Sequence, residues 1–210
     1  MSRRTTRVME VPAFVLQSTP WRETSLILKA FTKDHGIVTM VAKGAKRPYS
    51  GLRASLMVFQ PLLLSWSGAG EVKTLIQAEV ASINAMPGSV LMSGWYMNEL
   101  LLKLLASEDA HQNLFNAYAQ ALGELASLDS TARGREAATV LRRFEWTLLR
   151  EIGYGLSGPE PDFADQSQGP QLKELLQEKI LAQIPGSALS SRQVLLSLYR
   201  LASPPAPHDL

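Results

Sequence analysis

The first eighty residues contain five short apolar segments separated by turn residues, and this pattern restricts the fold more than any other feature. The segments cover residues 11–17, 25–33, 37–42, 57–66 and 71–80. Asp34-His35-Gly36 and Ser67-Gly68-Ala69-Gly70 are typical of hairpin turns. Five short strands are too few for a two-sheet sandwich and suit a small closed or nearly closed barrel. Pro61 falls inside the fourth segment and predicts an edge or a bulge there.

From residue 89 onward the apolar spacing becomes helical. The first helix is expected to bury a stripe made of Leu91, Trp95, Asn98, Leu102 and Leu105. Further helices are predicted at 113–127, 136–152, 172–184 and 191–201, with a loop over 156–170. The stripe of the 136–152 helix is Ala137, Leu141, Phe144, Leu148 and Ile152. We therefore expect an α+β chain with a five-stranded barrel over 1–82, an all-helical domain over 87–202 and a disordered tail over 203–210.

Composition excludes several classes of site. The chain has no cysteine and only three histidines, far apart in sequence, so we expect no disulfide, no metal and no cofactor. The basic N-terminus does not resemble a signal peptide, because Glu10 and Pro12 interrupt the apolar stretch that follows. No run of eighteen apolar residues occurs, so we expect no membrane span and a cytoplasmic location.

A basic loop over residues 42–53 is the first candidate binding feature. It carries four positive charges and no negative one, and Gly, Pro and Tyr break it, so neither strand nor helix is expected there. Residues 1–80 hold eleven Lys/Arg against five Asp/Glu, whereas residues 81–210 hold ten against fourteen. An exposed cationic loop beside a small barrel favours nucleic acid, which cations bind through phosphates and aromatic rings through stacked bases. The expected DNA-binding residues are Arg22, Lys43, Lys46, Arg47, Tyr49 and Arg53. The alternative is a solvated loop without a partner.

A second cationic group lies in the 136–152 helix. Arg142, Trp146 and Arg150 follow each other at intervals of four, off the apolar stripe, and Arg143 is adjacent. A tryptophan between arginines suits an acidic peptide that ends in an aromatic residue. The alternative is that Trp146 packs on a neighbouring helix.

No catalytic constellation is evident. Residues 153–158 spell G-x-G-x-x-G, but this stretch follows a helix and precedes Pro159, whereas a dinucleotide site needs a strand before it and a helix after it. No Ser-His-Asp arrangement with supporting glycines occurs, and no phosphate-binding loop follows Gly44. We therefore do not expect an enzyme.

Several ordered motifs resemble the bacterial RecO family. These are Trp21-Arg22-Glu23-Thr24-Ser25-Leu26, residues 31–36, Val41-Ala42-Lys43-Gly44-Ala45-Lys46-Arg47, and Phe59-Gln60-Pro61-Leu62 with residues 66–75. The helical part adds Tyr96-Met97-Asn98-Glu99-Leu100-Leu101 and residues 141–145 and 148–154. The resemblance runs from about residue 10 to about residue 156, and as an ordered set the motifs are highly specific.

The resemblance implies an N-terminal OB barrel, a C-terminal helical domain and a role as a DNA repair and recombination mediator. It implies binding to single- and double-stranded DNA, annealing of complementary strands, contact with RecR and with the acidic tail of single-strand-binding protein, and help in loading RecA. It implies no covalent chemistry. Under this interpretation Arg142, Arg143, Trp146 and Arg150 would hold the tail of single-strand-binding protein.

The chain departs from the family pattern in two respects. Many members carry a four-cysteine zinc finger after the Gly-Tyr segment, and this chain has no cysteine. Residues 192–210 contain only Arg192 and Arg200 as basic residues, where members usually have a basic closing segment. An RNA-binding or protein-scaffold OB module is the alternative function, because composition does not distinguish DNA from RNA.

Overall fold

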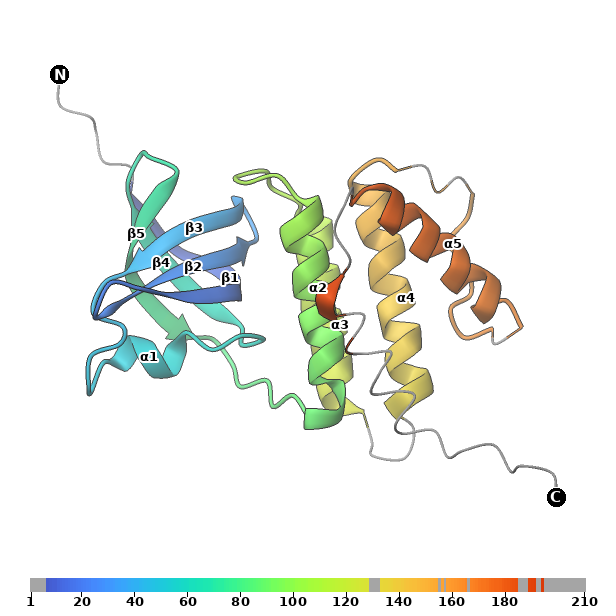
Figure 1. Ribbon diagram of the computed structural model, residues 1–210, viewed down its shortest axis with the longest axis horizontal. Coiled ribbons are helices and arrows are strands. Elements are labelled where there is room, and N and C mark those ends of the chain that lie inside the picture. The colour runs from blue at the N-terminus through green and yellow to red at the C-terminus, as the bar shows by residue number, and fades with distance from the viewer. Residues whose placement is uncertain are drawn as a thin grey trace.

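The computed structural model describes residues 7–128, 133–154, 156, 158–165, 167–184, 189–191 and 194. A barrel lies at one end of the long axis and a group of helices at the other (Figure 1). The elements are β1 (Arg7–Trp21), β2 (Ser25–Thr32), β3 (Gly36–Ala42), α1 (Gly51–Ser55), β4 (Leu62–Ser67), β5 (Val72–Val80), η1 (Gly88–Val90), α2 (Leu91–Leu104), α3 (Gln112–Ser127), α4 (Arg133–Glu151) and α5 (Gly169–Ala182). This arrangement confirms the expected fold class. The predicted tail over 203–210, and most of the predicted 191–201 helix, lie outside the described residues.

The barrel is closed, with strand order β1-β2-β3-β5-β4. Strands β3 and β5 pair in parallel, and the other neighbours are antiparallel. Strand β1 has 15 residues and pairs with two different strands, β2 and β4, and these two pairings close the barrel. An irregularity between Val15 and Gln17 bends it. Together with the helix α1 between β3 and β4, this topology is that of an OB fold.

Strand β1 is buried on both faces in its middle, which explains its apolar run. Ala13 and Val15 lie in the barrel core with residues such as Met40. Phe14 and Leu16 point the other way and belong to the core of the helical part. The Phe14 ring meets the Tyr118 ring edge-on, with 5.2 Å between centroids. The strand therefore joins the two parts of the molecule through one continuous apolar contact.

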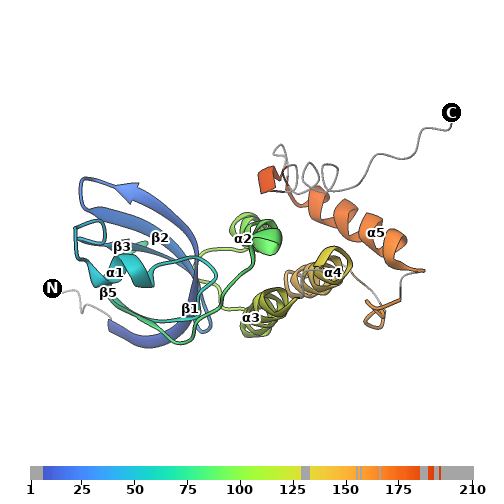
Figure 2. The same ribbon diagram turned by 90° about the horizontal axis from the view of Figure 1, so that it is seen from below.

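Helices α2 and α3 lie against the barrel, α4 packs behind them, and α5 is outermost (Figure 2). A buried polar tie fixes α2 to β1. The side-chain amide of Asn98 donates to the Leu16 carbonyl at 2.9 Å, and the Tyr118 hydroxyl donates to the Asn98 side-chain oxygen. Burial raises the pKa of the Tyr118 hydroxyl, so it stays protonated and remains a donor.

The loop between α2 and α3 gives a second attachment to the barrel. The Glu108 backbone N–H donates to the Ile37 carbonyl at 3.0 Å, and its carboxylate lies 2.8 Å from the Lys73 ammonium. Gly36 turns with a φ of 63°, and a Cβ there would lie 1.9 Å from the Asp109 carbonyl oxygen. Only glycine can occupy this contact, since any side chain would overlap the loop backbone.

A third polar contact ties the chain after α5 back to α2. The Glu99 carboxylate accepts backbone N–H bonds from Ser190 at 3.0 Å and Ser191 at 2.9 Å, and a further bond from the Ser191 hydroxyl. Burial by itself would raise the pKa of Glu99. The bonds from Ser191 and Ser190, with Lys103 nearby, outweigh burial and hold that pKa below its usual value.

Several predictions about individual elements were wrong. Strand β4 begins at Leu62 and not at residue 57, because Phe59 has a φ of 67° and Pro61 lacks an N–H. The basic loop was expected to hold no helix, yet Gly51–Ser55 forms α1, and Leu56 after it is buried in the barrel core.

The stripe predicted for the first helix was also misplaced. Leu91 and Trp95 are exposed, whereas Met97, Leu100 and Leu101 are buried. Within the predicted stripe, Asn98 is buried, and it is polar because it makes the tie to β1.

Candidate nucleic-acid interface

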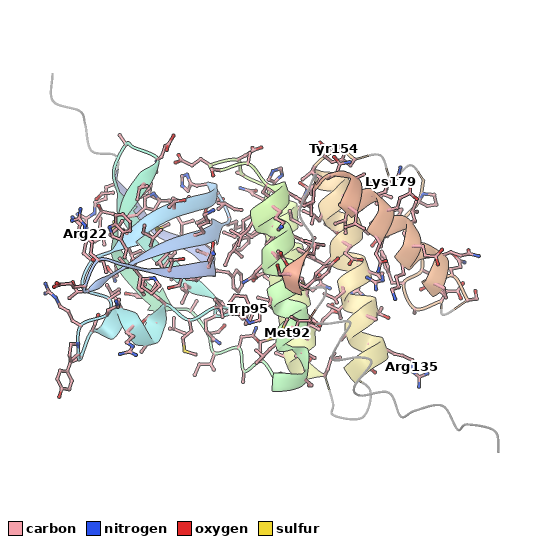
Figure 3. The ribbon with its side chains drawn as sticks, in the orientation of Figure 1. Arg22, Met92, Trp95, Arg135, Tyr154 and Lys179 are labelled. Carbon is pink, nitrogen blue, oxygen red and sulfur yellow. The ribbon has the colours of Figure 1, made fainter. Side chains whose placement is uncertain are left out.

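A groove of about 580 Å³ lies at one end of the barrel, between the β1–β2 turn and the loop after β3. Arg22, Lys43 and Arg47 line it, and Glu23 is its only acidic lining residue among those described. The Lys46 backbone N–H donates to the Thr24 carbonyl at 2.9 Å, which fixes the loop against the turn. The structure therefore brings cations from two distant sequence segments to one concave surface. Figure 3 places Arg22 at the left-hand side of the barrel, remote from the helices.

The turn that carries Arg22 is tight. Trp21 and Ser25 are the last paired residues of β1 and β2, so only three residues connect the strands. Arg22 has a φ of 53°, a conformation that asparagine and glycine adopt more readily than arginine. Its guanidinium carbon lies 5.9 Å from the centre of the Trp21 ring. Backbone strain of this kind clusters at functional sites, which is consistent with a role for this turn in binding.

The other predicted DNA-binding residues lie on the same loop but do not line the groove. Lys46 and Arg53 are exposed, and Arg53 belongs to α1. Tyr49 has its side chain completely exposed and a φ of 65°. The loop nevertheless has a buried side, because Ala45 is fully buried and belongs to the barrel core.

Sequence reasoning missed Lys29, an exposed cation on the sheet that does not line the groove. It lies in β2 opposite Gln17 of β1 and Thr39 of β3, and it is exposed between the buried Leu28 and Ala30. Single-strand-binding OB folds use this face of strands 2 and 3 together with the adjoining loops. Lys29 is the only charged residue of β2, and a single charge inside an otherwise apolar strand was the signal that could have identified it.

The arginines of α4 lie elsewhere on the molecule. Figure 3 places Arg135, near the beginning of α4, at the opposite side of the molecule from Arg22. A groove of about 780 Å³ runs between α4, the end of α3 and the beginning of α5. Its basic lining residues are Arg135, Arg142, Arg143 and Lys173, and its acidic ones are Glu124, Glu136, Asp162 and Asp165. The lining charges balance, in contrast to the barrel groove.

Both central arginines of α4 already have partners. Arg142 lies 2.6 Å from the buried Glu145 carboxylate, which also accepts a bond from the Tyr96 hydroxyl at 2.7 Å. Arg143 lies 2.8 Å from Glu124 and remains 39% exposed. Arg150 is exposed and does not line this groove.

Trp146 is not at the surface, contrary to the expectation. It is 6% exposed, and its ring meets Phe163 edge-on with 6.4 Å between centroids. The ring is therefore buried, as the alternative interpretation required, although the residue that it meets lies in the loop before α5 and not on a neighbouring helix. The apolar face of α4 is therefore wider than the predicted stripe. Trp146 does not line the groove itself but contacts Phe163, which does.

The described part of the chain contains no group of three His, Asp or Glu side chains that could hold a metal ion. No described helix combines the length and the apolar character needed to cross a membrane.

Comparison with known proteins identifies the family. The model of the Recombination protein O N-terminal domain matches residues 7–84, and that of the Recombination protein O C-terminal domain matches residues 89–158. The DNA repair protein RecO of Aromatoleum aromaticum is 56% identical over 151 residues, which are 71% of this chain and 60% of that protein. The DNA repair protein RecO of Ralstonia nicotianae is 55% identical over 149 residues, 70% of this chain and 53% of that protein.

The chain thus spans between about half and three fifths of the length of these relatives. The two domain models together match well over half of the chain, in the order barrel and then helices. The chain belongs to the RecO family.

Proposed function

We propose that this protein is a DNA repair and recombination mediator that binds single- and double-stranded DNA and anneals complementary strands. The barrel groove, with three cations and one acid around a concave surface, is the observation that carries the proposal. Phosphates would bind Arg22, Lys43 and Arg47, with Lys46 and Arg53 at the edge of the loop and Tyr49 available to a base of a longer strand. The relatives' name, DNA repair protein, supports DNA as the ligand.

Annealing needs no covalent chemistry. A protein that neutralises phosphates on each strand lowers the repulsion between two complementary strands and raises their encounter rate. Binding through the backbone leaves sequence choice to base pairing, so the surface need only be cationic and accessible. The exposed basic loop and the groove provide both properties.

An annealing assay tests this proposal. Complementary fluorescent DNA strands of about 50 nucleotides should anneal several times faster with the protein than without it. Matched RNA strands separate DNA binding from the alternative of an RNA-binding module. No acceleration, combined with no measurable DNA binding at low salt, would refute the proposed function.

We also propose that the helical part contacts the acidic tail of single-strand-binding protein, and that the protein acts with RecR to load RecA. The groove beside α4 supports the first contact, because Arg142 and Arg143 line it next to apolar residues such as Leu128 and Phe163. Arg143 is the stronger candidate, since its side chain is 39% exposed and that of Arg142 is 16% exposed. Arg150 continues the same helix, and Trp146 would support the groove through its contact with Phe163.

The existing ion pairs set the expected size of this effect. A peptide carboxylate must share Arg143 with Glu124 or compete with Glu145 for Arg142. Each new ion pair should therefore add only as much binding free energy as an exposed pair at the edge of an interface, which is less than a buried ion pair adds. Arg143→Ala should weaken a labelled tail peptide by about three- to tenfold in fluorescence anisotropy. Lys179→Ala on α5 is the matched control. Equal peptide affinity in the Arg142/Arg143→Ala double variant, with the fold intact, would place the contact elsewhere.

A further inference from the structure

The barrel groove contains one aromatic residue whose placement suits an unpaired base. Trp21 lines the groove, is 45% exposed and lies outside the barrel core. It is the last residue of β1 and pairs with Ser25 of β2, so its backbone is held by the sheet. Because this tryptophan lines a concave surface together with cations, it offers an apolar ring and an indole N–H to a ligand in the groove.

Three cations, Arg22, Lys43 and Arg47, line the same groove as this ring. Arg22 lies over the ring at 5.9 Å, near the outer limit for a cation–π contact, so the indole is only loosely covered. Lys43 and Arg47 come from the facing loop and line the same groove. One ring and three cations around about 580 Å³ can hold one base and the phosphates beside it.

We propose that Trp21 stacks an unpaired base in this groove, so that the protein binds single-stranded DNA more tightly than duplex DNA. This inference rests on the proposed DNA-binding function. In a duplex each base is already stacked between its neighbours, so stacking on Trp21 adds no affinity for duplex DNA. The cations, in contrast, contact the phosphates of both single-stranded and duplex DNA. The cations therefore set general affinity for DNA, and Trp21 sets the selectivity between the two forms.

Tyr49 is the competing aromatic residue, and its geometry is less suited to this role. Its side chain is fully exposed at the tip of the basic loop and does not line the groove. A ring on a strand end is pre-organised, whereas ordering a free ring on a loop reduces the affinity gained by stacking. A strand of a few nucleotides that fills the groove would reach Trp21 before Tyr49.

The test compares labelled oligothymidine of about eight nucleotides with a blunt-ended DNA duplex, which has no unpaired base. Trp21→Ala should weaken oligothymidine by about 5- to 100-fold, the range for loss of one base–aromatic stack. The same variant should weaken the duplex by less than about twofold, because its phosphate contacts remain. Trp21→Phe should recover most of the single-strand affinity. Tyr154→Ala, which removes an exposed ring after α4 far from the groove, should leave both ligands unchanged.

Intrinsic fluorescence provides a second readout. Trp66 and Trp146 are buried, and Trp95 of α2 is the other exposed tryptophan, packed edge-on against Phe59. In a Trp95→Phe protein, oligothymidine should still quench the emission, and in a Trp21→Phe protein the quenching should disappear. Equal losses on both DNA forms in Trp21→Ala, or quenching that persists without Trp21, would overturn the inference. Absence of DNA binding by the wild-type protein would instead refute the proposed function itself.

Discussion

Neutralising the barrel groove should weaken DNA binding in a way that salt dependence can quantify. The variant is Arg22/Lys43/Arg47→Ala, which removes the three cations that line the groove. The salt slope is the slope of the logarithm of the binding constant against the logarithm of the salt concentration, and each phosphate contact on a single strand contributes about 0.7 to its size. Loss of one such contact should therefore lower the affinity by about fivefold near 0.1 M salt. If all three residues contact phosphates, binding should weaken by about a hundredfold, and the slope should become shallower by about 2.

The assay is fluorescence anisotropy of labelled oligothymidine, repeated at salt concentrations from about 50 to 200 mM. The matched control is a triple alanine variant of Arg150, Lys173 and Lys179, which removes the same charge from α4 and α5. That control should change affinity by less than about threefold through the long-range field alone. Circular dichroism establishes that both variants are folded. An unchanged slope in the groove variant, or equal losses in both variants, would refute the assignment of phosphate contacts to the groove.

Three further predictions concern stability and metal content. The pKa of Glu99 in the folded protein lies below its usual value, so its stabilisation is complete above pH 4.5 and is lost as pH falls through the folded-state pKa; Glu99→Gln should cost about 1 kcal/mol at pH 7 by urea unfolding, and the difference should shrink in acid. Gly36→Ala should lower the free energy of unfolding by about 2–4 kcal/mol in the same assay, because a Cβ there meets the Asp109 carbonyl oxygen at 1.9 Å. The control is Gly123→Ala, which has open space within a helix and should raise the free energy of unfolding by up to about 1 kcal/mol. If the two variants changed stability equally, the close approach of Asp109 to Gly36 could not be the cause. Elemental analysis of untagged protein should find zinc well below one ion per chain, since the chain has no cysteine, and one zinc retained through dialysis would contradict this.

The barrel was predictable from sequence because its strands are short, apolar and separated by clear turns. The closing pairs, β1 with β4 and β3 with β5, were not predictable, because pairing between distant segments leaves no local signal. The helix α1 was missed since Gly51 and a single apolar Leu52 give no helical period.

Burial in α2 and α4 shows where helical patterns mislead. The spacing of Leu91 and Trp95 predicted a 3.6-residue stripe, but α2 lies between the barrel and α4 and buries a different and broader face. Trp146 was placed outside the stripe for the same reason, because the apolar spacing within one helix does not indicate its contact with Phe163 in the loop before α5. A helix packed on two sides has no single apolar stripe.

The candidate site was partly predictable. The cations of the basic loop could be identified from charge alone, because no acid interrupts them. That Arg22 and Lys43 share one groove, while Tyr49 lies outside it, depends on the fold and on the bond from Lys46 to Thr24. The partner of Arg143 was equally hidden, since Glu124 is nineteen residues away in sequence. Glu145, in contrast, follows Arg142 by three residues on the same helix, a spacing at which an ion pair can be expected.

Hydrogen exchange with and without single-stranded DNA tests the central claim, that the barrel groove is the DNA interface, most directly. Oligothymidine should slow amide exchange in the β1–β2 turn and in residues 43–55, while α5 exchanges at the same rate in both samples. Protection confined to the helices, with no change in the turn or the basic loop, would contradict the assignment of DNA binding to the barrel.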